Sequence, residues 1–182
     1  MSVSVDNELL ETVREIGPTI RAGAADAERE RLLTRPVVEA MREAGLFRLL
    51  TPRSLGGLEV DPLTFARVME EGSRFDSAAG WALQNDSGAW WCCRLPDEGA
   101  EELYADDPEA ILAAAFHPPL EAAAVDGGYR LTGQRPFASN IHEATWLFVT
   151  AVAGEAAIGA IVRAGEAEIV DTWHTLGMRG TD

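Results

Sequence analysis

The feature that most constrains this fold is a change in hydrophobic period near Asp107-Pro108. Before this point, apolar residues recur every three or four positions, which is typical of amphipathic helices. After it, short apolar runs are separated by turns, and Tyr129 and Leu131 alternate with polar neighbours as in half-exposed strands. A helical half followed by an antiparallel half predicts an α+β fold, not a doubly wound sheet. We expect a helical domain over residues 1–108 and an incomplete antiparallel β-domain over 109–182.

The helical half carries start and stop signals for several helices. Asp6 is placed to cap the first, and Pro18 inside it is a candidate kink or break. Further helices are expected to begin at Thr34, at Asp61-Pro62 and at Asp76-Ser77, and a short acidic helix to end near Tyr104.

The second half supplies candidate strands and turns. Asp126-Gly127-Gly128 favours a hairpin, because glycine tolerates the positive φ that such turns need. Strands are expected at 111–116, 129–134, 146–152, 157–162 and 169–173. Residues 176–182 form a glycine-rich turn that would normally lead into another strand, so we expect a fragment with exposed strand edges.

Charge and residue usage exclude several kinds of protein. The formal net charge of −15 disfavours binding to nucleic acid or to an anionic membrane surface. Every basic residue is arginine, which excludes a lysine Schiff base and a lysine-type phosphate loop. Apolar stretches are too short to span a bilayer, and the N-terminus lacks the pattern of a signal peptide.

The cysteines and histidines give no sign of a disulfide framework or a metal site. Cys92 and Cys93 are adjacent and cannot staple a fold, which favours a reducing, cytoplasmic setting. His117, His142 and His174 lie far apart, without the paired spacing of a zinc site. We therefore expect no metal.

Composition and spacing alone indicate little chemistry. The carboxylates Glu70, Glu71 and Asp76 are more simply a solvated helix face and a cap than an acid–base pair. A group of tryptophans, at positions 81, 90 and 91, is more simply core or interface than a cofactor site. From these features alone, the chain is a soluble acidic α+β domain.

Five motifs in order carry a resemblance to a known family. They are the segment from Ala44-Gly45-Leu46-Phe47 through Pro52 to Leu55-Gly56-Gly57, then FARVMEEGSRFDSAAGWA (65–82), DGGYRLTGQRPFASN (126–140), WLFVT (146–150) and DTWHTLGMRGT (171–181). With them, the chain resembles the N-terminal and middle portions of the acyl-CoA dehydrogenase superfamily. The resemblance implies a helical domain, a middle β-domain and a C-terminal four-helix bundle, and the bundle would be absent from this chain.

The resemblance also implies a flavin site, with FAD or FMN as cofactor. In the family, the segment matching Phe137, Ala138, Ser139 and Asn140 lies against the isoalloxazine. Phe137 would pack on the ring in place of the commoner tryptophan, and Ser139 would donate near flavin N5. The alternative is a strand end with an inward Phe and a polar turn.

The second implied cofactor contact is the segment that begins at Phe116 and His117. Here the sequence departs from the dehydrogenases, because their Thr-Glu-Pro and Gly-Ser-Asp motifs are missing. Phe116 and Pro118 fit the pattern of the related flavin monooxygenases, although Leu120 replaces a glycine and so puts close backbone approach in doubt. His117 would face the flavin N1–C2=O edge; a simple loop histidine is the equal alternative.

Two functions follow from the resemblance. The first is a flavin-dependent oxidoreductase, either an acyl-CoA dehydrogenase or a monooxygenase that takes reduced flavin from a separate reductase and uses oxygen. The substrate would be an acyl-CoA thioester or an aromatic compound, and family members are usually homotetrameric. The family's carboxylate base lies in the missing bundle, so no catalytic residue is assigned. The second is a non-catalytic remnant, or a subunit whose partner supplies the bundle.

Overall fold

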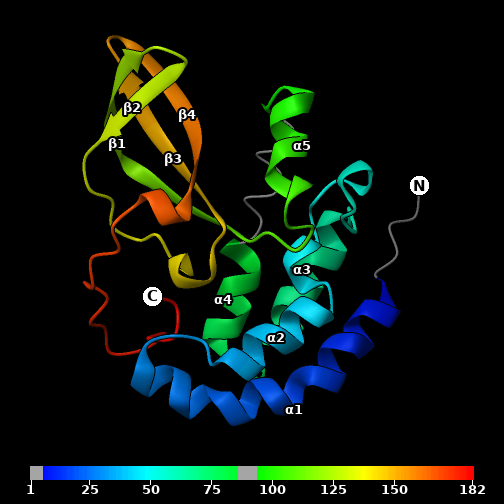
Figure 1. Cartoon of the computed structure of the whole chain (residues 1–182). Helices are drawn as coiled ribbons and strands as arrows, with labels where there is room; N and C mark the ends of the chain where they lie inside the picture. Colours follow the sequence, from blue (N-terminus) through cyan, green and yellow to red (C-terminus); the bar gives the residue numbers. More distant parts are fainter. Residues whose placement is uncertain (1–5, 86–93) are drawn as a thin grey trace.

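The structure is a computed structural model that describes residues 6–85 and 94–182. Helices occupy the first half and a four-stranded sheet the second (Figure 1). The α-helices are α1 (Asn7–Glu30), α2 (Arg35–Glu43), α3 (Pro62–Ser73), α4 (Ser77–Asn85) and α5 (Asp97–Ala105). Short 3-10 turns are η1 (Leu46–Arg48), η2 (Arg53–Leu55), η4 (Ile141–Glu143) and η5 (Ala164–Glu166).

Helix α1 is capped as predicted but is not split. The Asp6 side chain accepts a hydrogen bond from the Leu9 backbone N–H. Pro18 lies inside the continuous helix. Its position is exposed, so the backbone carbonyl that loses an N–H partner can be solvated by water. The helix ends at Arg31, which has a φ of 66° and whose N–H donates to the Ala27 carbonyl.

The helical half has one core, formed where α1 runs beneath α2, α3 and α4 (Figure 1). Buried side chains from all four helices meet there, among them Val13, Ile20, Met41, Val68 and Leu83. Gly17 lets α1 pack closely against Phe75, because a Cβ at position 17 would lie 2.2 Å from the Phe75 ring. The sequence expectations for Trp90, Trp91, Cys92 and Cys93 fall outside the described residues.

The sheet has the order β2-β1-β3-β4 and is mixed. Its strands are β1 (Leu112–Val125), β2 (Gly128–Thr132), β3 (Trp146–Ala153) and β4 (Ala156–Arg163). Both hairpin pairs, β1 with β2 and β3 with β4, are antiparallel, whereas β1 and β3 pair in parallel. Strand β2 runs back along the second half of β1 and ends opposite Glu121, and residues 133–145 cross to the other edge of β1. The α+β class is confirmed, but the sheet is not wholly antiparallel.

The prediction of a strand at 169–173 is wrong. These residues form no strand, and the chain instead leaves the sheet after η5 and returns to the end of α1 (Figure 1). An antiparallel bridge joins Leu32 to Thr181. The apolar residues of this segment are typical of a strand, but its backbone runs back to the helical half instead of pairing with the sheet.

The change from helix to strand falls where the hydrophobic period changes, between Ala105 and Leu112. Helix α5 nevertheless shares a core with the sheet: Leu103 and Tyr104 pack with Leu112 and Trp146. The division into domains at residue 108 therefore stays a prediction. In the parts of the chain that the structure describes, none of the helices combines the length and the apolar character needed to cross a membrane.

Candidate functional site

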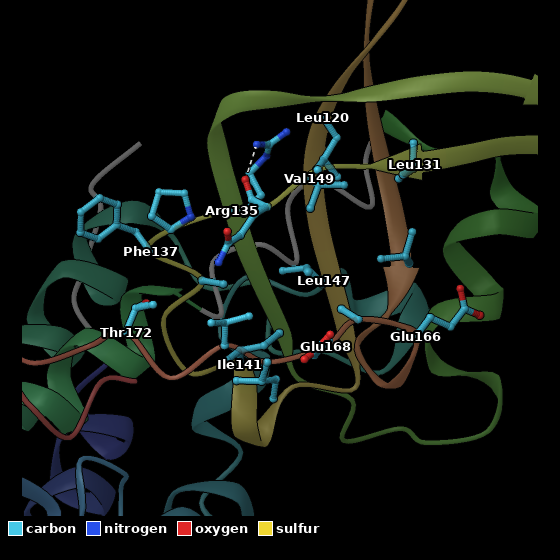
Figure 2. Close-up of a pocket in the computed structure, with 18 of the residues that line it drawn as sticks. Leu120, Leu131, Arg135, Phe137, Ile141, Leu147, Val149, Glu166, Glu168 and Thr172 are labelled. Carbon is cyan, nitrogen blue, oxygen red and sulfur yellow. Dashed lines mark hydrogen bonds between the residues drawn. The ribbon is translucent and has the colours of Figure 1, made fainter.

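One face of the sheet forms the wall of a large cavity of about 1170 Å³ (Figure 2). Aliphatic side chains from four strands line it: Leu120, Leu131, Leu147, Val149 and Val162. The loop 133–139, η4 and the returning segment 166–173 form its rim. Three of the predicted flavin residues, Phe137, Ala138 and Ser139, therefore lie together at this rim.

Phe137 is strongly exposed to solvent. Its side chain is 72% exposed, and Figure 2 shows the ring at the edge of the cavity, apart from the aliphatic side chains of the sheet. The backbone φ of Phe137 is 60°, a left-handed conformation that is uncommon for a bulky residue. Strained, exposed aromatic residues are characteristic of functional loops.

The residues after Phe137 fix the loop. Ala138 packs against the apolar face of the sheet, and its carbonyl accepts from the Ile141 N–H. Asn140 is 5% exposed and has a φ of 63°. Its backbone N–H donates to the Thr181 carbonyl at 3.1 Å. This backbone hydrogen bond supports the loop. The buried Asn140 Nδ2 is a donor with no hydrogen-bond partner among the described residues.

Phe116 and His117 lie where β1 loses its regular pairing with β3. The register shifts between Ala115 and Leu120. Phe116 is on the opposite face of β1 from Ala115, half exposed, and its ring packs on Phe148 with centroids 5.6 Å apart. Thr150 Oγ1 donates to the Phe116 carbonyl, and His117 is exposed. The structure does not bring Phe116 or His117 into the cavity.

Leu120, at the position where the related monooxygenases have glycine, packs inward. Its side chain joins the apolar cluster on the cavity face of the sheet. A Cβ on Gly133, whose φ is 136°, would lie 2.9 Å from Leu120 Cδ2. Gly133, on the loop after β2, therefore leaves room for the Leu120 side chain.

Arg135 is a cavity residue to which the sequence analysis gave no role. Its Nη1 donates to the Gln134 carbonyl at 2.7 Å, as drawn in Figure 2. Its Nε and Nη2 are buried and have no hydrogen-bond partner among the described residues. Burial lowers the pKa of this guanidinium, although an arginine still remains a cation. Arg135 could therefore hold an anionic or carbonyl group placed in the cavity.

Sequence reasoning also missed the residues that support Phe137. Trp173 meets the Phe137 ring edge-on, with centroids 5.9 Å apart and planes at 81°. Arg31 binds both carboxylate oxygens of Asp171, two residues before Trp173. The guanidinium holds the pKa of Asp171 below its ordinary value. Positions 31 and 171 are 140 residues apart, so local pattern gives no signal for this pair.

The rim of the cavity carries groups that suit a flat aromatic cofactor. The exposed Phe137 ring offers an aromatic surface and Ser139 a polar group. Across residues 6–85 and 94–182, no three or more His, Cys, Asp or Glu side chains are grouped so that they could hold a metal ion.

Comparison with known families agrees with the order of the motifs. The family model described as "Acyl-CoA dehydrogenase, N-terminal domain" matches residues 6–103. Indole-3-acetate monooxygenase from Pseudomonas putida is 30% identical over 189 residues, covering 95% of this chain and 44% of that protein. The oxygenase component of FADH(2)-dependent resorcinol hydroxylase from Rhizobium sp. is 30% identical, again covering 95% of this chain and 44% of its own length.

Solved structures show the same fold. XiaF from Streptomyces sp., in complex with FADH2 and glycerol, superposes with a TM-score of 0.92 at 34% identity and covers 96% of this chain and 46% of its own. The HsaA monooxygenase from M. tuberculosis superposes with a TM-score of 0.89 at 28% identity, covering 98% and 50%. The chain spans about half the length of the curated relatives it matches.

Proposed function

Because this chain belongs to the acyl-CoA dehydrogenase family, we propose that it is the flavin-binding part of the oxygenase component of a two-component, flavin-dependent monooxygenase. The single observation that carries this proposal is Phe137, 72% exposed and held at a positive φ on the rim of the cavity. Exposing an aromatic ring in a strained loop is unfavourable without a partner. A planar apolar cofactor would cover that ring.

The chain's own residues would hold the flavin by contact and by hydrogen bonds. Phe137 packs on the isoalloxazine, and Ser139 donates toward the N5 edge. Phe116 and His117 lie outside the cavity, so the segment 116–119 would meet the flavin through Pro118, which lines it. The irregular pairing of β1 supports this role, because backbone groups outside a regular ladder can bind a ligand. When bound, reduced flavin would react with molecular oxygen.

The monooxygenase branch is favoured over the dehydrogenase branch. The named relatives include an indole-3-acetate monooxygenase and an FADH(2)-dependent resorcinol hydroxylase, oxygenase component. An oxygenase component that uses reduced flavin requires a separate flavin reductase as its partner. By the same reasoning, the substrate is an aromatic compound rather than an acyl-CoA thioester. The absence of the Thr-Glu-Pro motif from 116–119 agrees with this choice.

A second candidate, a subunit that is inactive alone, is favoured by one feature. The aliphatic face of the sheet opens into the cavity, which Arg135 also lines, and two buried nitrogen atoms of Arg135 have no hydrogen-bond partner within 6–85 and 94–182. Such a face needs a covering segment or partner. In the family, the C-terminal bundle completes the flavin pocket and supplies the base, so we expect no turnover by these 182 residues alone.

A flavin titration of the purified chain tests both candidates. FAD and FMN, oxidised and anaerobically reduced, are titrated in parallel and followed by fluorescence and visible absorbance. If the proposal is right, binding saturates and Phe137→Ala raises the Kd about tenfold, with a smaller rise for Ser139→Ala. Trp81, on α4 and also partly exposed, provides the control variant Trp81→Ala, which should leave the Kd unchanged.

Three outcomes separate the candidates. Saturable binding that depends on Phe137 but gives no substrate oxidation supports a flavin-binding part that needs its bundle. Oxidation of a substrate by this chain alone would overturn the expectation of inactivity. A folded sample that binds neither flavin in either redox state would refute the flavin site for this chain.

A further inference from the structure

We propose that the Arg31–Asp171 ion pair is a positioning device for the Phe137 ring, acting through Trp173. The inference rests on the proposed function, because Phe137 is the ring that would meet the flavin. It adds a link from the end of α1 to the cofactor loop. Arg31 and Asp171 are positioning residues, and neither touches the cofactor.

Arg31 is held in one orientation by the backbone at the end of α1. It adopts the left-handed conformation, and its N–H donates to the Ala27 carbonyl at 2.8 Å. Its side chain is only 19% exposed. Both terminal nitrogens bind the Asp171 carboxylate, with Nη2 at 2.6 Å from Oδ2. A two-point contact of this kind fixes direction as well as distance.

Trp173 is fixed at two places by the same arrangement. Its carbonyl accepts from Arg31 Nη1 at 3.3 Å, and its indole Nε1 donates to the Met178 carbonyl at 3.0 Å. The Met178 carbonyl also accepts from Thr181 Oγ1 at 2.8 Å. Backbone and ring of Trp173 are therefore both attached, the backbone to α1 and the ring to the turn at 178–181.

The positioned indole then sets the Phe137 ring. The two rings make a near-perpendicular edge contact, with centroids 5.9 Å apart. Phe137 is 72% exposed, so little else restrains its ring. A displaced Trp173 would leave the Phe137 rotamer free and add an ordering cost to cofactor binding. The orientation of the cofactor-facing ring thus depends on a residue more than a hundred positions earlier in the chain.

Other contacts hold the chain end in place without Arg31, which makes its role separable from folding. The Arg179 N–H donates to Glu28 Oε1 at 3.0 Å. Gly180 packs against Ala27 and Ala78, where a Cβ would lie within 3.0 and 3.2 Å of their methyl groups. Removing the Arg31 side chain should therefore release the Trp173 backbone, and leave the indole held only through Met178, without detaching residues 178–182.

The test reads the ring directly and does not depend on flavin. The full chain is labelled with 4-fluorophenylalanine, and the Phe137 signal is assigned by its loss in Phe137→Leu. Arg31→Gln should move this ¹⁹F signal toward its position in Trp173→Leu. It should also raise the flavin Kd about fivefold. The matched control is Arg29→Gln, because Arg29 lies in the last turn of α1 and, in the part of the chain that the structure describes, forms its ion pairs with its neighbours Asp26 and Glu30.

Exchange of the charges provides a rescue. Arg31→Asp combined with Asp171→Arg should restore part of the ¹⁹F shift and part of the affinity that either single change removes. An unshifted Phe137 signal in Arg31→Gln would overturn the positioning role whether or not flavin binds. A shifted signal with unchanged flavin Kd, in a chain where Phe137→Ala does weaken binding, would also overturn it and leave the flavin site standing. If no flavin binds at all, the Phe137 ¹⁹F signal of Arg31→Gln alone tests whether Arg31 positions the ring.

Discussion

The indole of Trp146 donates from Nε1 to the carbonyl of Leu103 at 2.9 Å. Trp146 begins β3 and is 6% exposed, and Leu103 lies in α5. The Arg163 guanidinium, from β4, lies 4.3 Å from the centre of the indole ring. One side chain therefore joins a helix to two strands, at the place where the helical half meets the sheet.

Trp146→Phe should destabilise the chain more than Arg163→Met, which removes the cation next to the indole ring. The substitution removes the only donor of the indole and leaves the Leu103 carbonyl without this partner, at a cost of about 1–2 kcal/mol in the free energy of unfolding. Arg163→Met removes a partly exposed cation–π contact, which contributes about 0.5–1 kcal/mol, and a surface ion pair with Asp106, which contributes little. Urea unfolding of both variants makes the comparison. Equal losses would show that the hydrogen bond contributes nothing beyond ring packing.

The sequence predicted the elements better than it predicted their connections. Capping by Asp6, the helix starts near residues 35, 62 and 77 and the hairpin after Val125 all depend on neighbouring residues, and all are present. The parallel pairing of β1 with β3 and the return of 169–173 to α1 depend on contacts across the chain. Period and turn signals do not carry that information, so an apolar return segment was predicted as a strand.

The candidate site divides in the same way. Phe137 and Ser139 were predicted from a family motif, and the structure places both at the rim of one cavity. Arg135 and Trp173 lie within quoted motifs, but only the three-dimensional arrangement shows that Trp173 contacts Phe137 and that Nε and Nη2 of Arg135 have no hydrogen-bond partner among the described residues. Single-sequence reasoning can therefore find the loop, whereas the residues that support the loop have to be found in space.

Gly57→Ala should cost at least about 2 kcal/mol of stability, because it overpacks a rigid site. Gly57 belongs to the Leu55-Gly56-Gly57 motif, and a Cβ there would lie 2.0 Å from the Thr51 carbonyl oxygen. Thr51 is fully buried, and its carbonyl also accepts from the Glu59 N–H, so the backbone cannot easily retreat. Thermal unfolding with Gly165→Ala as control tests this, since a Cβ at Gly165 meets no atom within 4 Å. Similar melting temperatures for the two variants would contradict the expected clash.

Arg135→Met should stabilise this chain. The guanidinium has two buried nitrogen atoms without partners among the described residues, and burial lowers its pKa, so its charged form is disfavoured in the fold. Replacing this partly buried cation by an apolar side chain of similar length is therefore expected to raise the free energy of unfolding. Arg130→Met is the control, because Arg130 also lines the cavity but is exposed. A loss of stability in Arg135→Met would mean that the guanidinium is already paired in solution.

The attachment of Trp173 should weaken in acid. Arg31 lowers the pKa of Asp171, and the nearby His174 and His142 lower it further. A lowered pKa in the folded state means that the stabilisation is fully present above the unfolded value, about pH 4. It is lost as the pH falls through the lowered folded value, because only the ionised carboxylate binds the guanidinium at both oxygens.

The pH dependence of the Phe137 ¹⁹F signal measures this loss. The other ionisable groups that act on the ion pair are His174, whose Nε2 is 3.4 Å from Asp171, Asp182, 3.8 Å from Arg31, and His142. The titration is therefore run in a His142→Gln, His174→Gln background, which removes both histidines. The signal should stay constant from neutral pH to about pH 4 and then move toward its position in Trp173→Leu. In Asp171→Asn the signal should already lie near that position and change little in acid. An acid step in Asp171→Asn as large as in its parent would contradict the assignment to Asp171.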